Sequence, residues 1–151
     1  MQTPANPQRR RLLGAGAVLC TLSMRPAQAS SDELDAAVRA FAGQAPMREG
    51  RVRIEIEPLV ENGNTVPIAV EVDSAMTPAD HVQAIALFNE RNPQREVAVF
   101  HLGPRSGRAR VGTRIRLATS QRLVAVARMS DGSHWSARAD VIVTLAGCLE
   151  G

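Results

Sequence analysis

Cys148 is the residue whose type and position best suit covalent chemistry. It lies three residues before the C-terminus of a chain of 151 residues. A cysteine thiolate is a nucleophile that can form bonds to a second sulfur atom. Alternating apolar residues at Val141, Val143 and Leu145 predict a last strand that ends near Ala146, so the thiol is expected beyond the sheet. This position suits a group carried on a short tether, and an incidental cysteine or an intermolecular disulfide is the other interpretation.

Other residues give little support for catalysis by the chain itself. The sequence has no glycine-rich phosphate loop, no H-E-x-x-H motif and no C-x-x-C motif. His81, His101 and His134 are far apart, and each lies in a strand pattern, which indicates rim or partly buried side chains rather than a metal site. A metal-binding redox sandwich or a thiol peroxidase would need a metal or a base near Cys148. We therefore expect no catalytic residue, no metal ligand and no cofactor.

A run of arginines is the remaining candidate site. Five of them fall within twelve residues and could attract an anion or an acidic partner: Arg105, Arg108, Arg110, Arg114 and Arg116. Arg110, Arg114 and Arg116 share strand parity, which is also typical of a solvated strand face. Both interpretations stay open from the sequence.

The first 29 residues have the pattern of a secretory signal. Arg9-Arg10-Arg11 precede an apolar stretch over 12–24, and Ala27-Gln28-Ala29 supply small residues for cleavage. The paired arginines before Leu12-Leu13 favour twin-arginine export, with an ordinary Sec signal as the alternative. We expect cleavage after Ala29 and a location in the periplasm.

Cleavage would change the charge and the cysteine count. The formal charge is +3 from 18 basic residues, all arginine, and 15 acidic residues. Four arginines and Cys20 would leave with the signal, so the mature chain would carry 14 basic against 15 acidic groups, a net −1, and one thiol. This near-neutral balance, with no apolar run of the roughly 20 residues that a membrane span needs, predicts neither nucleic acid nor membrane as a partner.

The remaining chain reads as one small all-β domain. Ser30 and Glu33 have the spacing of a capping box ahead of a short helix that reaches Phe41. Asp131-Gly132 is a strong hairpin signal. Strand patterns are expected over 52–57, 66–72, 81–89, 96–102, 110–118, 122–129, 133–138 and 140–146. These spacings predict an immunoglobulin-like antiparallel β-sandwich with a short N-terminal helix and a flexible C-terminal tail, in three parts: signal 1–29, sandwich 30–145 and arm 146–151.

Short motifs run through this domain and end at the cysteine: Glu61-Asn62-Gly63, Val66-Pro67, Asn92-Pro93 before 97–102, the stretch 113–117, Ser130-Asp131-Gly132 and Gly147-Cys148. With them and the twin-arginine leader, the chain resembles the SoxY family. SoxY is the sulfur-carrier subunit of periplasmic thiosulfate oxidation. The resemblance implies that Cys148 is the covalent attachment site of sulfur intermediates and that the chain catalyses nothing.

The resemblance also implies partners. These are a SoxZ-like subunit in a heterodimer, and transient contacts with a c-type haem enzyme, a dimanganese hydrolase and a sulfane dehydrogenase. The main alternative is an exported immunoglobulin-like interaction module whose single cysteine makes an intersubunit disulfide.

The expected carrier arm departs from the family pattern. The family ends in Gly-Gly-Cys-Gly-Gly, whereas this chain has Ala146, Gly147, Leu149, Glu150 and Gly151 around the cysteine. Leu149 adds bulk beside the thiol. Glu150 and the terminal carboxylate add negative charge, which should raise the pKa of the thiol above its usual value near 8.5. The sequence therefore predicts a divergent arm, with partner enzymes that have wider entrances or with reduced thiosulfate turnover.

Overall fold

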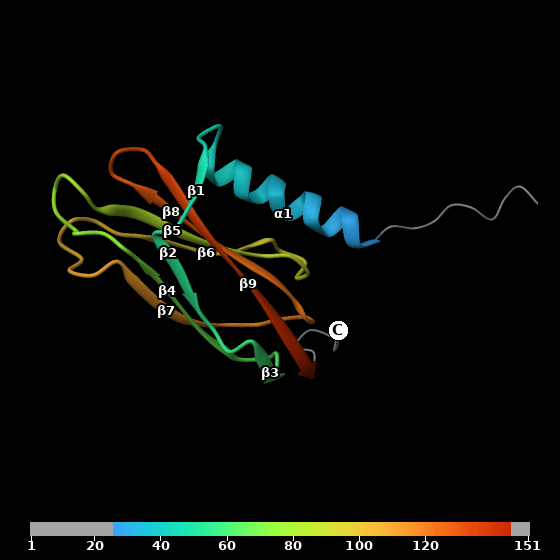
Figure 1. Cartoon of the computed structure of the whole chain (residues 1–151). Helices are drawn as coiled ribbons and strands as arrows, with labels where there is room; N and C mark the ends of the chain where they lie inside the picture. Colours follow the sequence, from blue (N-terminus) through green and yellow to red (C-terminus); the bar gives the residue numbers. More distant parts are fainter. Residues whose placement is uncertain (1–25, 146–151) are drawn as a thin grey trace, which may run out of the picture.

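The computed structural model describes residues 26–145 of the chain. The predicted signal sequence up to residue 25, and the whole arm with Cys148, lie outside the described residues. Figure 1 shows two facing β-sheets, with one helix across the outer face of the larger sheet. Between residues 26 and 145 no helix has the length and apolar character needed to cross a membrane.

In the described part of the chain, nine strands form the two sheets. The larger sheet has the order β1-β9-β8-β5-β6, with β3 also paired to β9, and the smaller has the order β2-β4-β7. The larger sheet comprises β1 (Met47–Glu49), β3 (Leu59–Asn62), β5 (Val82–Asn89), β6 (Glu96–His101), β8 (Gln121–Met129) and β9 (His134–Leu145). The smaller comprises β2 (Val52–Glu55), β4 (Val66–Val72) and β7 (Arg110–Ile115). The predicted all-β sandwich with one short helix is confirmed.

The last strand differs from the prediction. The sequence suggested two strands, over 133–138 and 140–146, but β9 is one strand of 12 residues. Ala139 and Asp140 stay in register with Leu123 and Arg122 of β8, so nothing breaks the ladder between the two segments. One long strand therefore connects the hairpin at Gly132 to the start of the predicted arm.

Two short strands were missed, and both run parallel to β9. β1 pairs with the first residues of β9, and β3 pairs with its last residues. Both lie on the edge of β9 opposite β8, so the chain crosses between the sheets on its way through β1, β2, β3 and β4. Strands of three and four residues carry too little alternation to be recognised from sequence. The turn between β3 and β4 begins after Asn62.

The helix α1 (Pro26–Ala42) explains why β5 and β8 are apolar on both faces. One face of these strands packs against the smaller sheet, and the other packs beneath α1, where Leu34 meets Phe88, Val124 and Val126. Strands covered on both sides lose the alternation of polar and apolar residues. The helix starts at Pro26, so Ser30 lies inside it, and the predicted capping box at Ser30 and Glu33 is not at a helix end in this chain.

Candidate functional site

The candidate site is the end of the sandwich at which β9 stops, because the predicted arm begins there. Three consecutive residues, Ala146, Gly147 and Cys148, follow Leu145. At about 3.3–3.6 Å per residue, the thiol is tethered within roughly 10 Å of the last residue of β9. The sheet therefore decides where the cysteine can go, and what holds the end of β9 matters for its function.

β9 is held on both edges up to its last residues. On one edge β3 pairs with it as far as Asn62 and Leu145. On the other edge β8 ends at Gln121, opposite Val141. Beyond this point the side chain of Ser120 forms hydrogen bonds to the backbone of β9. The Val143 N–H donates to the Ser120 hydroxyl oxygen at 2.9 Å, and this hydroxyl donates to the Val143 carbonyl at 3.4 Å. Ser120 thus continues the ladder beyond the backbone of β8.

A second side chain ties β9 to β3. The Thr144 hydroxyl donates to the Glu61 carbonyl oxygen at 3.1 Å. With the backbone pairs and Ser120, this bond fixes the base from which the predicted arm leaves. Sequence reasoning missed the roles of Ser120 and Thr144, because a serine before one strand and a threonine within another carry no distinctive pattern.

An asparagine joins the two loops at this end of the sandwich. The side-chain amide of Asn92 donates to the Arg116 carbonyl at 2.7 Å. Its side-chain oxygen accepts from the Ala118 N–H at 3.0 Å and from the Gln121 amide at 2.8 Å. The Asn92 N–H donates in turn to the side chain of Asn89, which is only 1% exposed. Asn92 thus braces the loop that leads into β8.

A groove opens beside the same end because β2 stops early. Glu55 pairs with Ala69, so two residues further on Glu57 would face Pro67. At every second residue along this side of β4, the backbone N–H donates to a carbonyl of the opposite chain segment, as the Asp73 N–H does to the Arg51 carbonyl. Proline has no N–H, so the ladder cannot continue there. The chain leaves the smaller sheet at this point, and a groove of about 790 Å³ lies between β2, β3 and β4.

Two arginines of the run, Arg108 and Arg110, form ion pairs with glutamates of the smaller sheet. Arg110 makes two bonds of 2.7 Å to the Glu55 carboxylate, and one of 3.1 Å to Glu71. Arg108 also reaches Glu71 at 3.1 Å. The Arg110 guanidinium lowers the pKa of Glu55, and Glu55 raises the pKa of Arg110. For Arg108 and Arg110 the structure favours the solvated strand face over a free anion site.

The three histidines are not brought together into a metal site. His134 is 6% exposed and packs edge-on against Phe41 with ring centroids 6.3 Å apart. Burial lowers the pKa of His134, and the charge of Arg128 lowers it further. His81 lies 3.0 Å from the Thr77 carbonyl oxygen through Nδ1, and His101 ends β6 at the surface. Over residues 26–145, no group of three or more His, Cys, Asp or Glu side chains could hold a metal ion.

The fold defines a β-sandwich protein, and comparison with known proteins identifies its family. A search of the solved structures finds similarity to the sulfur carrier protein SoxY from Chlorobium limicola f thiosulfatophilum. The identity is 30% and the TM-score 0.64, covering 76% of this chain and 99% of that one. The family described as sulfur oxidation protein SoxY matches residues 38–148. This chain belongs to the SoxY family, whose members are carrier subunits rather than enzymes.

Superoxide reductases share the fold at lower identity. The superoxide reductase (neelaredoxin) from Ignicoccus hospitalis is 20% identical with a TM-score of 0.55, over 62% of this chain and 80% of that one. The enzyme from Nanoarchaeum equitans is 16% identical with a TM-score of 0.53, over 64% of this chain and all of that one. At these identities the likeness concerns the sandwich alone. No curated protein sequence is significantly similar to this chain.

Proposed function

We propose that this protein carries sulfur intermediates of thiosulfate oxidation on Cys148, at the tip of an arm formed by residues 146–151. The observation that carries the proposal is the extent of the family match, which begins within α1 and ends at residue 148, the cysteine itself. The anchoring of β9 by β3, Ser120 and Thr144 supports it, because a carrier arm needs a rigid base. The proposed parts are a signal over 1–29, the sandwich over 30–145 and the arm.

The chemistry at the thiol would proceed in two steps. After the thiol proton leaves, the Cys148 sulfur forms an S–S bond with the terminal sulfur of thiosulfate, and two electrons pass to an oxidising partner. The family resemblance implies a c-type haem enzyme for this role. Addition of water across the bond between sulfur and the sulfonate group then releases sulfate and leaves a persulfide on the cysteine. The carrier contributes the nucleophile and its position, and partners contribute the oxidation and the hydrolysis.

The same proposal includes a partner subunit and a compartment. A SoxZ-like subunit would form a heterodimer with this chain, and twin-arginine export would bring the folded complex to the periplasm. The arm would carry Leu149 and Glu150 where the family has glycines, so we propose a divergent carrier whose partner enzymes accept a bulkier tip.

Reconstituted thiosulfate oxidation tests the proposal. The chain, a SoxZ subunit and the partner enzymes are combined, and sulfate release is followed with the wild type and with Cys148→Ser. We expect release with the wild type and none with Cys148→Ser, while both proteins show the same melting temperature. Equal sulfate release from the two proteins would refute the assignment of Cys148.

A further inference from the structure

The surface beside the base of the arm presents a pair of large apolar side chains to solvent. Leu59 is 58% exposed and Ile142 is 59% exposed, and they are the exposed large hydrophobic side chains within residues 30–144. They are register partners in the parallel pair of β3 and β9, so they lie next to each other. Isolated apolar side chains are common on protein surfaces, but adjacent ones mark a contact surface when more apolar area adjoins them.

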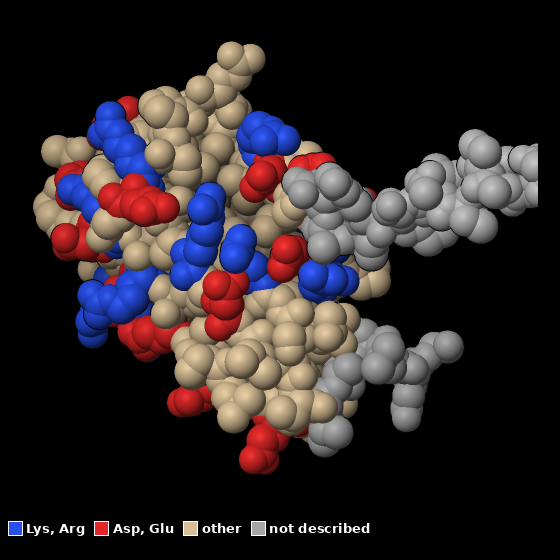
Figure 2. Space-filling model, turned by 45° about the vertical axis from the view of Figure 1, so that its right-hand side comes forward, with Lys and Arg blue, Asp and Glu red and all other residues tan. Residues whose placement is uncertain are grey.

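The groove beside β2 supplies that adjoining area. Leu59 is one of its lining residues, together with the half-buried Ile56 and Val60 and the exposed Pro67, and the buried Val66 and Ile68 form its floor. An apolar surface therefore runs from Ile142 across Leu59 into the groove. In Figure 2 the lower part of the molecule, where Figure 1 places β3 and the end of β9, is a continuous uncharged area with acidic side chains along its lower edge. We call Leu59, Ile142 and the groove the docking surface.

The charges around the docking surface select its occupant. Glu57 and Glu61 line the groove, and neither has an ion pair with another described residue. Glu55 also lines it, but its charge is matched by Arg110. The predicted arm of the same chain carries Glu150, so it would bring like charge to the groove. A second copy in a symmetric pair would set the same acidic rim against itself.

We propose that the docking surface binds a partner protein that presents apolar side chains flanked by arginine or lysine. The apolar part would fill the groove and cover Leu59 and Ile142, and the basic part would pair with Glu57 and Glu61. Because β3 also anchors the end of β9, a partner bound there sits at the base of the predicted arm. The inference rests on the proposed function only in taking the SoxZ subunit as the probe.

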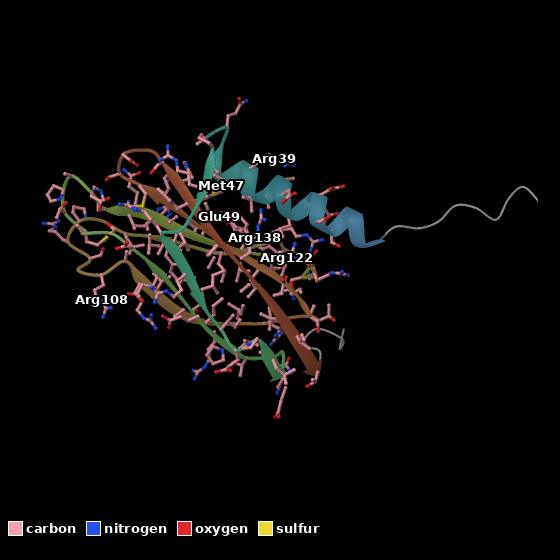
Figure 3. All side chains as sticks on the ribbon, in the orientation of Figure 1. Arg39, Met47, Glu49, Arg108, Arg122 and Arg138 are labelled. Atoms are coloured by element: carbon pink, nitrogen blue, oxygen red, sulfur yellow. The ribbon has the colours of Figure 1, made fainter. Side chains whose placement is uncertain are left out.

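Titration calorimetry of the full chain with purified SoxZ tests the docking surface. One variant combines Leu59→Arg with Ile142→Arg, and a second combines Glu57→Arg with Glu61→Arg. The matched control is Glu49→Arg, an exposed acidic residue that also pairs with β9 but at its other end (Figure 3). We expect each double variant to weaken binding at least tenfold, because central interface residues commonly contribute that much. The control should bind as the wild type does. Binding by the wild type should weaken with salt, and binding by the Glu57 and Glu61 variant should not.

Three outcomes would overturn the inference. These are wild-type affinity in both double variants, an equal loss in the Glu49→Arg control, and self-association of the chain that the apolar double variant abolishes. All these side chains are exposed, so melting temperatures should match and exclude misfolding as the cause. Cys148→Ser should keep full affinity for SoxZ. A wild-type chain that binds SoxZ through this surface but never loads sulfur would contradict the proposed function and leave the docking surface standing.

Discussion

Replacing Asn92 by alanine removes the side chain that joins the two loops next to the end of β9. Three hydrogen bonds are lost: to the Arg116 carbonyl, from the Ala118 N–H and from the Gln121 amide. At about 0.5–1.5 kcal/mol each, and with Gln121 buried, we expect Asn92→Ala to lower the free energy of unfolding by about 2–3 kcal/mol. For a domain of this size that corresponds to a fall of roughly 6–12 °C in melting temperature.

Urea denaturation followed by circular dichroism measures this change. The control is Asn64→Ala, because Asn64 is exposed and its backbone N–H, not its side chain, makes the bond to Asn62. The control should change stability by less than about 0.5 kcal/mol. A loss below about 1 kcal/mol in Asn92→Ala, or an equal loss in the control, would refute the view that this asparagine braces the loops.

Three further predictions address the core, a buried histidine and the arm. Phe88→Ala should lower the free energy of unfolding by about 3–5 kcal/mol, because Phe88 is fully buried under α1. Leu59→Ala in the isolated chain should lower it by less than about 0.5 kcal/mol, because Leu59 is exposed. Denaturant titration of both variants measures the two changes. Burial lowers the pKa of His134, so the unfolded chain binds more protons near pH 6, and the free energy of unfolding should fall as the pH drops below about 6.5. His134→Phe should flatten this pH dependence of stability, and His101→Gln should not. Equal pH profiles for the wild type and both variants would contradict the prediction. Replacing Leu149 and Glu150 by glycines should lower the pKa of the Cys148 thiol and speed its loading, and an unchanged pH profile of thiol alkylation would remove the basis for a divergent arm.

The strong local signals of the sequence predicted the right architecture, and the weak ones did not. Alternation in β4 and the Asp131-Gly132 turn are local, so β4 was predicted with its bounds and the hairpin in its place. β1 and β3 depend on pairing with β9, which is distant in the chain, and β9 itself was predicted as two strands. Tertiary pairing outweighs local pattern in such short segments.

For the candidate site, sequence provided the cysteine but not its surroundings. Cys148 was singled out by its type and its distance from the last apolar alternation, and its role stays a prediction. The anchoring by Ser120 and the bracing by Asn92 depend on loops that meet only in the folded chain. The groove beside Pro67 follows from the register of β2 and β4, which the sequence alone does not provide.

The mass of the C-terminal peptide tests the central claim most directly. The protein is purified without reductant from cells oxidising thiosulfate, digested, and the peptide that contains Cys148 is analysed by mass spectrometry. The carrier function predicts sulfur, persulfide or thiosulfate adducts on this cysteine that a reductant removes, and none in Cys148→Ser. A peptide found only as the free thiol, or only as a disulfide between two copies of the chain, would contradict it.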